Sequence, residues 1–255
     1  MSDGIARAAL WGRDHVELGD VATASAGPHG ALALTRGLHA KTYRYEDPNE
    51  DVVAVTVGPN GTLLVCADGH NGALSSHVAV ETILELVPDP PATLGDKAWL
   101  ELFGAANDAV VSRKGIASPQ PASETVLLAA LVTPGRVSFA AIGDASLVTC
   151  TAGADRGRQL NKEGMRFLGR PLSSRALKGN VQRGDKSLAA DEWVICVTDG
   201  LSEFIAPLRP ADLLPRLLAG VPPEATPDAA ARAIADAAGA AGAGDNVGVA
   251  LVAPA

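Results

Sequence analysis

The stretch VVAVTVGPNGTLLVCADGHNG, residues 52–72, consists of two apolar runs joined by the four-residue turn Gly58-Pro59-Asn60-Gly61. Runs rich in Val, Leu and Thr are typical of β-strands, and so short a turn joins antiparallel strands. The stretch therefore predicts a β-hairpin whose second strand ends at Asp68-Gly69-His70. Asp and Gly both favour turns, so a strand that simply closes also explains this ending.

The register of the hairpin brings acidic residues together. A turn centred on Pro59-Asn60 sets Asp51 opposite Asp68 and places Glu50 beside Gly69. Like charges directly opposite one another destabilise a sheet unless a cation holds them together. The hairpin therefore predicts a cation site at the ends of its strands.

Two further strand ends carry aspartates. The apolar run Trp193–Thr198 ends in Asp199, and Asp245 precedes the run Asn246–Val252. If these two strands pair in the antiparallel sense, both aspartates lie at the same edge of a sheet.

A second hairpin, Glu124–Thr133 with Arg136–Ile142, places Asp144 opposite Thr125. Oxygen ligands without Cys, and with His only at position 70, suit Mg²⁺ or Mn²⁺ better than zinc or copper. An Asp-Gly pair taken singly is more often a turn, but acids at several strand ends favour a metal site. The acids concerned are Glu50, Asp51, Asp68, Asp144, Asp199 and Asp245.

The order of the elements predicts an α+β fold. Helical spacing marks a pair of segments after the first hairpin and a second pair before the last strand: Ser75–Val87, Lys97–Lys114, Pro210–Ala219 and Pro227–Ala241. Consecutive hairpins exclude the strand–helix alternation of a doubly wound fold, and antiparallel sheets covered by paired helices are the natural layered solution.

Two regions are less regular. Residues 153–191 are rich in Arg, Lys and Gly, with weak periodicity. Residues 1–40 contain two strand-like pieces, Val16–Thr23 and Ala31–Thr35, which we expect to supply an edge of one sheet. Since no linker or repeat divides the chain, we expect a single domain over residues 1–255.

The composition is that of a soluble globular protein, with 47% hydrophobic and 20% charged residues. The net charge is −8 and no dense run of Lys and Arg occurs, so nucleic acid and anionic membranes are not expected partners. The three separated cysteines, the lack of a signal-type apolar segment in residues 1–20 and the lack of a membrane-spanning run predict a reducing, cytoplasmic location. These cysteines are Cys66, Cys150 and Cys196.

Five motifs together resemble those of the metal-dependent protein serine/threonine phosphatases, the PPM type or 2C-like family. They occur in the order of that family and span residues 47–252: PNED at 48–51, ADGHNG at 67–72, AIGDAS at 141–146, VTDGLSEF at 197–204 and GDNVGVALV at 244–252. The resemblance implies a four-layer α-β-β-α sandwich, two antiparallel β-sheets flanked by pairs of helices, with a binuclear Mn²⁺ or Mg²⁺ centre at one end.

The resemblance also implies roles for residues. Asp68 would bridge the two ions, with Glu50 and the Gly69 carbonyl on one of them. The remaining ligands would be Asp199 and Asp245 on the other ion, Asp51 through a metal-bound water, and Asp144 on a third, more loosely held ion. A metal-bridging hydroxide would attack phosphorus directly, and His70 would protonate the leaving seryl or threonyl oxygen.

The chain departs from the family pattern in three places. Glu46 stands where the family has its phosphate-binding Arg, and Arg44 is the nearest substitute. The GDSR motif reads GDAS, and the region between Asp144 and Asp199 is short where the family carries a flap.

The expected protein is a phosphatase, monomeric, acting on phosphorylated proteins and opposing a serine/threonine kinase. Two other functions stay open: a catalytically weakened regulatory or phosphoprotein-binding module, and a hydrolase of small phosphoesters. Close carboxylates repel one another without metal, which disfavours a pure binding module.

Overall fold

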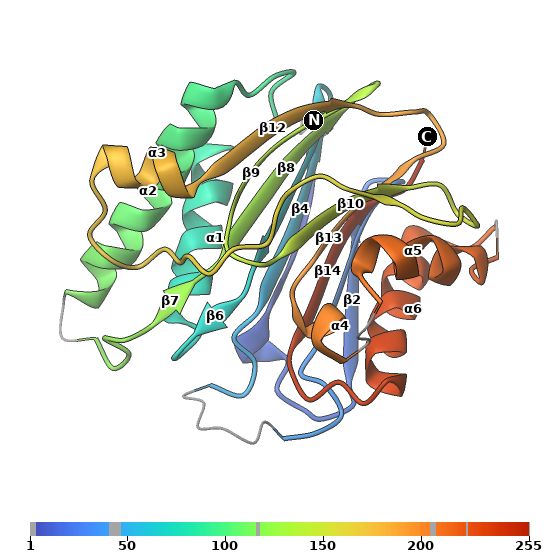
Figure 1. Cartoon of the computed structure of the whole chain (residues 1–255), viewed down its shortest axis with the longest axis horizontal. Helices are drawn as coiled ribbons and strands as arrows, with labels where there is room; N and C mark the ends of the chain where they lie inside the picture. The colour runs from blue at the N-terminus through green and yellow to red at the C-terminus, as the bar shows by residue number, and fades with distance from the viewer. Residues whose placement is uncertain (1–3, 41–46, 116–117, 205–207, 223, 255) are drawn as a thin grey trace.

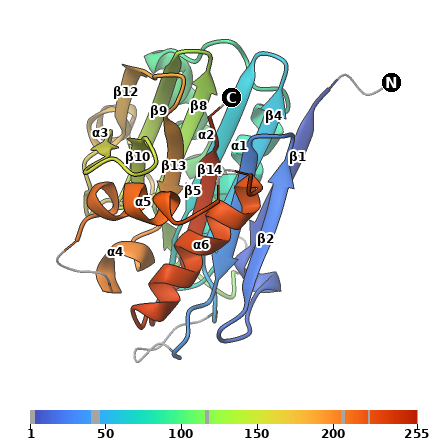
Figure 2. The same ribbon diagram turned by 90° about the vertical axis from the view of Figure 1, so that its right-hand side faces the viewer.

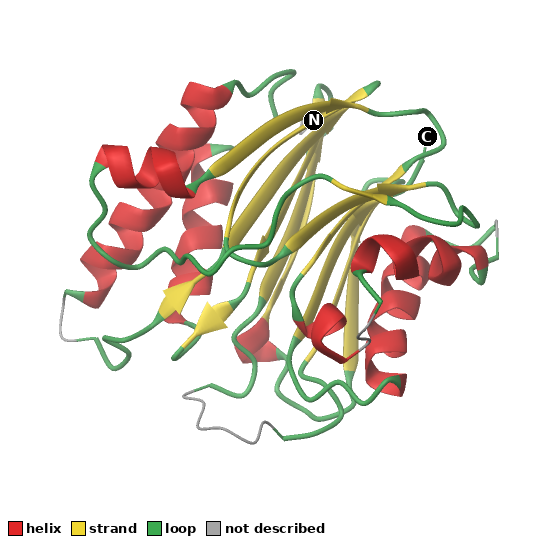
Figure 3. Ribbon diagram, in the orientation of Figure 1, coloured by secondary structure: helices red, strands yellow, loops and turns green. Residues whose placement is uncertain are grey.

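Two six-stranded antiparallel sheets stack face to face and carry helices on both outer faces (Figures 1 and 3). The structure is a computed structural model and describes residues 4–40, 47–115, 118–204, 208–222 and 224–254. The first sheet has the strand order β1-β4-β5-β8-β9-β12 and the second has the order β11-β10-β13-β14-β3-β2. The predicted four-layer α-β-β-α sandwich is therefore confirmed.

The strands of the first sheet are β1 (Ala6–Trp11), β4 (Val52–Gly58), β5 (Gly61–Ala67), β8 (Leu127–Thr133), β9 (Arg136–Ile142) and β12 (Gln182–Ser187). Those of the second sheet are β2 (Val21–Ala26), β3 (Gly30–Thr35), β10 (Ser146–Cys150), β11 (Arg158–Gln159), β13 (Trp193–Val197) and β14 (Val247–Val252). A separate two-stranded ribbon joins β6 (Gly69–His70) to β7 (Glu124–Thr125).

Helices α1 (Leu74–Leu86) and α2 (Asp96–Lys114) cover the first sheet, and the short α3 (Ser174–Asn180) packs on α2. On the other side, α5 (Pro210–Ala219) and α6 (Pro227–Ala240) cover the second sheet, as Figure 2 shows. The short α4 (Gly200–Phe204) follows β13, and the 3₁₀ turn η1 (Gly12–Asp14) follows β1.

The alternation of side chains explains why the strands are apolar almost throughout. In β4, Val52 and Ala54 pack under the helices, whereas Val53 and Val55 pack between the two sheets. Because successive side chains point to opposite faces and both faces are buried, no polar alternation is left for the sequence to show.

Three expectations differ from the structure. The predicted strand Glu124–Thr133 is two strands, because Thr125 pairs with Gly69 while Leu127 pairs with Ile142. The first forty residues supply an edge of both sheets, β1 in the first and β2 in the second. The weakly periodic region 153–191 contains β11, α3 and β12.

Among the described residues, none of the helices is both long enough and apolar enough to cross a membrane.

Candidate metal centre

The predicted hairpin register is confirmed, and it gathers the acidic residues at one end of the sandwich. Val52 pairs with Ala67, so the next residues outward are Asp51 and Asp68. The Gly69 amide donates to the Glu50 carbonyl over 3.2 Å, which continues the ladder by one more step. In the second sheet, β13 and β14 are antiparallel, so Asp199 and Asp245 lie at the same edge, as expected.

Three carboxylates converge at this edge. Asp68, Asp144 and Asp199 each offer an oxygen, and the three oxygens lie within 4.8 Å of one another. The pKa of Asp199 is raised to about 6, first by burial and then by the negative charges of Asp144 and Asp245. A hydrogen bond between the Asp199 and Asp68 side chains and the charge of His70 lower this pKa.

This arrangement fits a divalent cation. Neighbouring carboxylates that are partly buried raise one another's pKa, and a bound cation relieves that repulsion. A donor set made of oxygens suits Mg²⁺ or Mn²⁺.

Asp144 reaches the site through a glycine, not through a strand ladder. Its predicted position opposite Thr125 is wrong, because the β8–β9 pairing stops at Ile142 and Thr125 pairs with Gly69 instead. Gly143 has φ +105°, a conformation open to glycine but strained for other residues. The turn at Gly143 directs the chain out of the sheet and brings Asp144 to the other carboxylates.

We expect Gly143→Ala to remove Asp144 from the cluster. A Cβ at this position would overlap the Val126 side chain, and the positive φ adds strain. The variant should be less stable by about 2–4 kcal/mol and should bind Mn²⁺ more weakly by calorimetry. Gly135→Ala is the matched control, since Gly135 also has positive φ (+72°) but nothing within 4 Å of the added Cβ. Equal Mn²⁺ affinity in both variants would contradict this reading.

Glu50 and Asp51 are buried at the same edge and are held by both sheets. The Asn246 side chain accepts a hydrogen bond from the Glu50 amide at 3.0 Å, and the Thr198 hydroxyl donates to Asp51 Oδ2 at 2.8 Å. The Gly72 amide donates to Glu50 Oε1 at 2.6 Å. Asn246 and Thr198 are positioning residues, and the pattern of acidic residues did not predict them.

The segment between His70 and α1 is unusual in its backbone. Asn71 has φ +58° and Gly72 has φ +113°. Asn is one of the few residues other than Gly that tolerate the left-handed region, which explains how it can occupy this position. The two residues turn the chain so that the Gly72 amide faces Glu50.

Side chains from outside α1 form hydrogen bonds with backbone amides at the start of this helix. Asp47 Oδ2 accepts from the Ala73 amide and from Gln120, and Gln120 Oε1 accepts from the Leu74 amide. Ser123 accepts from the Ser75 amide at 3.0 Å and donates to the Gly72 carbonyl at 2.7 Å. These bonds satisfy the free amides of the helix start and fix the loop that contacts Glu50.

We expect Ser123→Ala to destabilise the protein by about 2 kcal/mol, because it leaves a buried amide and a buried carbonyl without their partner. Urea denaturation measures the loss. Ser112→Ala, at an exposed position on α2, is the control and should change the free energy of unfolding by less than about 0.5 kcal/mol. A Ser123→Ala protein as stable as this control would show that the network is not needed for folding.

His70 lies at the rim of the cluster and is exposed. The Phe167 ring packs against its imidazole, with the ring centroids 4.8 Å apart and the planes inclined at 45°. Glu124 pairs directly with His70 in the β6–β7 ribbon and forms a two-pronged ion pair with Arg170. Phe167, Glu124 and Arg170 were not expected in the site, because their proximity arises from long-range pairing.

Arg44, the expected phosphate-binding residue, and Glu46 lie outside the described residues. Their placement therefore stays a prediction.

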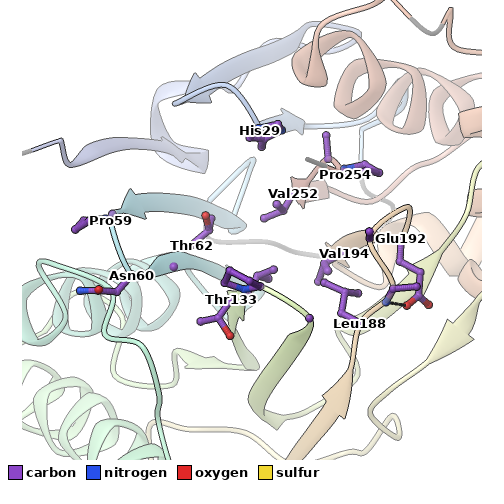
Figure 4. Close-up of a pocket in the computed structure, with 18 residues that line it drawn as sticks. His29, Pro59, Asn60, Thr62, Thr133, Leu188, Glu192, Val194, Val252 and Pro254 are labelled. Atoms are coloured by element: carbon purple, nitrogen blue, oxygen red, sulfur yellow. Dashed lines mark hydrogen bonds between the residues drawn. The ribbon is translucent and has the colours of Figure 1, made fainter.

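A separate cavity of about 420 Å³ lies at the opposite end of the strands (Figure 4). Its wall is mostly apolar, with Val194 and Val252 among the lining residues, and the β4–β5 and β8–β9 turns contribute to it. None of the predicted metal ligands lines it, so we assign the chemistry to the carboxylate edge.

Comparison with known proteins agrees with a metal-dependent phosphatase. The family model described as protein phosphatase 2C matches residues 40–237. The chain belongs to the protein phosphatase 2C family. A search of curated proteins finds no match.

Solved structures show the same fold. The serine/threonine phosphatase PstP of Mycobacterium tuberculosis is 19% identical, with TM-score 0.66, and the alignment covers 91% of this chain and 98% of that one. The catalytic domain of PstP in complex with two manganese ions is 19% identical, with TM-score 0.67 and coverages of 92% and 99%. A serine/threonine phosphatase from Staphylococcus aureus is 17% identical, with TM-score 0.67 and coverages of 94% and 97%.

Proposed function

We propose that this protein hydrolyses phosphoserine and phosphothreonine in other proteins, using two Mn²⁺ or Mg²⁺ ions and with Asp144 available for a third. The observation that carries the proposal is the convergence of Asp68, Asp144 and Asp199 oxygens within 4.8 Å at the edge where the family motifs meet. The PstP catalytic domain, which has this fold, was crystallised with two manganese ions. When bound, the ions supply positive charge to the phosphoryl oxygens and acidify a water.

Metal binding, proton donation and phosphate binding are assigned to different residues of the chain. The proposed metal ligands are Glu50, Asp51, Asp68, the Gly69 carbonyl, Asp144, Asp199 and Asp245. His70 donates a proton to the leaving oxygen, since it lies beside the cluster and its charge acts on Asp199. Water attacks phosphorus directly, so no covalent phosphoenzyme forms. Arg44 is the proposed contact for the phosphate.

The proposal also covers the domain organisation, the oligomeric state, the location and the opposing enzyme. The protein is a single phosphatase domain, acts as a monomer in the cytoplasm and opposes a serine/threonine kinase. Three free, buried cysteines support a reducing compartment.

The proposal is tested by hydrolysis of p-nitrophenyl phosphate and of a phosphothreonine peptide, each with Mn²⁺ and with chelator. We expect both substrates to be hydrolysed with Mn²⁺ and neither with chelator. Turnover in chelator would contradict the metal assignment. Hydrolysis of p-nitrophenyl phosphate alone would favour a small-phosphoester hydrolase, and a lack of any turnover, with intact Mn²⁺ and phosphopeptide binding, would favour the binding module.

A further inference from the structure

Positive charge is concentrated in one segment of this acidic protein. Residues 156–186 contain nine of the 21 Lys and Arg residues of the chain and two of its 29 Asp and Glu residues. The segment therefore carries +7 in a chain of net charge −8. The basic residues are spaced out along the sequence, so they form no dense run of Lys and Arg.

The segment crosses the molecule between the two halves of the sandwich. In Figure 1 it leaves β11, passes β7 and continues into α3 and β12. Its middle part is attached to the candidate metal centre at two points. The Gly164 amide donates to the carbonyl of Gly143, the neighbour of Asp144, at 2.9 Å, and the Phe167 ring contacts His70.

Further bonds hold this part of the segment in place. Leu168 and Thr125 exchange both backbone hydrogen bonds, at 2.8 and 3.1 Å. Asn107 of α2 accepts from the Gly169 amide at 2.9 Å and donates to the Arg170 carbonyl at 3.0 Å. The backbone of residues 162–170, which carries these side chains, is therefore bonded both to the metal edge and to α2.

Five exposed cations lie along residues 162–178, and we call them the basic rim: Lys162, Arg166, Arg170, Arg175 and Lys178. Within the part of the chain that the structure describes, only Arg170 of these forms an ion pair, with Glu124, and its side chain is still 73% exposed. By contrast, Arg156, Arg158 and Arg183 of the same segment face Asp212, Glu192 and Asp96. The other four rim cations are therefore available to an anionic ligand, and Arg170 keeps an exposed side chain beside them.

We propose that the basic rim selects phosphorylated protein segments that carry Asp or Glu next to the phosphorylated residue. This inference rests on the proposed function, and it names the substrate class. A clustered carboxylate site in a chain of charge −8 repels acidic segments, so the rim provides the attraction that lets them approach. Arg170 pairs with Glu124, the partner of His70 in the β6–β7 ribbon, and Arg175 and Lys178 lie on α3. The rim therefore offers a row of cations to an extended peptide whose phosphate reaches the metals.

The test compares three phosphothreonine peptides of equal length, with acidic, neutral or basic residues beside the phosphothreonine. Activity is measured as kcat/KM with Mn²⁺ at low and at high salt. An exposed ion pair contributes about 0.5 kcal/mol, so two or three such pairs give about a fivefold to tenfold preference for the acidic over the neutral peptide at low salt. High salt should reduce the preference, because exposed charges are screened.

Charge reversal locates the effect. Arg166→Glu, near the metal edge, and the double variant Arg175→Glu with Lys178→Glu, on α3, should each lower the acidic-to-neutral ratio by about threefold or more. Arg216→Glu makes the same charge change at an exposed position on α5, among the helices that cover the other sheet, and should leave the ratio as in the wild type. The peptide series on the wild type is informative even if a rim variant fails to fold.

Equal kcat/KM for the three peptides, or an unchanged ratio in both rim variants, would overturn the inference and leave the proposed function intact. Failure to hydrolyse any peptide with Mn²⁺ would instead overturn the proposed function. Should charge reversal weaken binding to phosphatidylserine vesicles while the peptide ratio stays the same, the rim would be a membrane-binding surface and the inference would be wrong.

Discussion

Asp199→Asn should abolish turnover and, in the absence of metal, make the protein more stable. Loss of one carboxylate leaves the metal centre incomplete. Bound metals stabilise the charge of the transition state by several kcal/mol, and losing that stabilisation corresponds to a fall in kcat of about 10³-fold or more. The stability effect has the opposite sign, because in the metal-free protein the Asp199 charge is unfavourable.

The sign follows from linkage. The folded-state pKa of Asp199 is about 6 against an ordinary 3.8, so the folded protein binds its proton more tightly than the unfolded chain does. Stability contributed by the protonated group is present below pH 3.8 and is lost as the pH rises to about 6. Above that pH the ionised group costs about 1–3 kcal/mol, which the Asn variant avoids.

Urea denaturation in chelator measures this difference. At pH 7.5 the Asp199→Asn protein should unfold at a higher urea concentration than the wild type, and at pH values near 4 the two should converge. With saturating Mn²⁺ the order should reverse, because a ligand that binds the folded state stabilises it. Asp155→Asn, at an exposed loop position, is the control and should follow the wild type throughout. A chelated variant less stable than the wild type at pH 7.5 would contradict the repulsion at this edge.

His70→Ala should lower kcat most for the substrates whose leaving group most needs a proton. With an alkyl phosphate, loss of the general acid should lower kcat by about 10²–10⁴-fold. With p-nitrophenyl phosphate, whose leaving group is stable as an anion, we expect a fall of less than about tenfold. The contrast between the two substrates measures proton donation separately from metal binding, which affects both.

The contact with Phe167 refines this experiment. Phe167→Leu removes the ring that packs 4.8 Å from the imidazole, so it should shift the ratio of the two substrates in the same direction by a smaller amount. His29→Ala changes a histidine at the far cavity and is the control. Equal losses on both substrates in His70→Ala would argue against the general-acid role.

Local rules were enough to predict the first hairpin and the second-sheet edge. The turn Gly58-Pro59-Asn60-Gly61 determines the register by itself, and the period of two then decides which residues lie opposite. The same rules failed beyond Ile142, where Gly143 leaves the ladder because a positive φ takes the chain out of the sheet. A register rule cannot include such a turn, since it needs a positive φ at Gly143, where Val126 leaves no room for a Cβ.

The first strand illustrates a different failure. β1, Ala6–Trp11, was not expected, although the expected pieces Val16–Thr23 and Ala31–Thr35 overlap β2 and β3. Four of its six residues are Ala or Arg, and Arg7 donates to Thr56 of β4 and to the Pro88 carbonyl. An edge strand of this kind owes its conformation to the neighbour it pairs with more than to its own propensity.

The sequence by itself determined the layered α+β architecture, the family and the edge at which the acids gather, because turn length, strand period and motif order are local properties of the chain. Only the tertiary structure decided that Asp144 joins Asp68 and Asp199 through the turn at Gly143, that Phe167 packs on His70, and that the basic rim is attached beside both. These relations join residues far apart in sequence, and they depend on how the sheets, α2 and the segment 156–186 pack against one another.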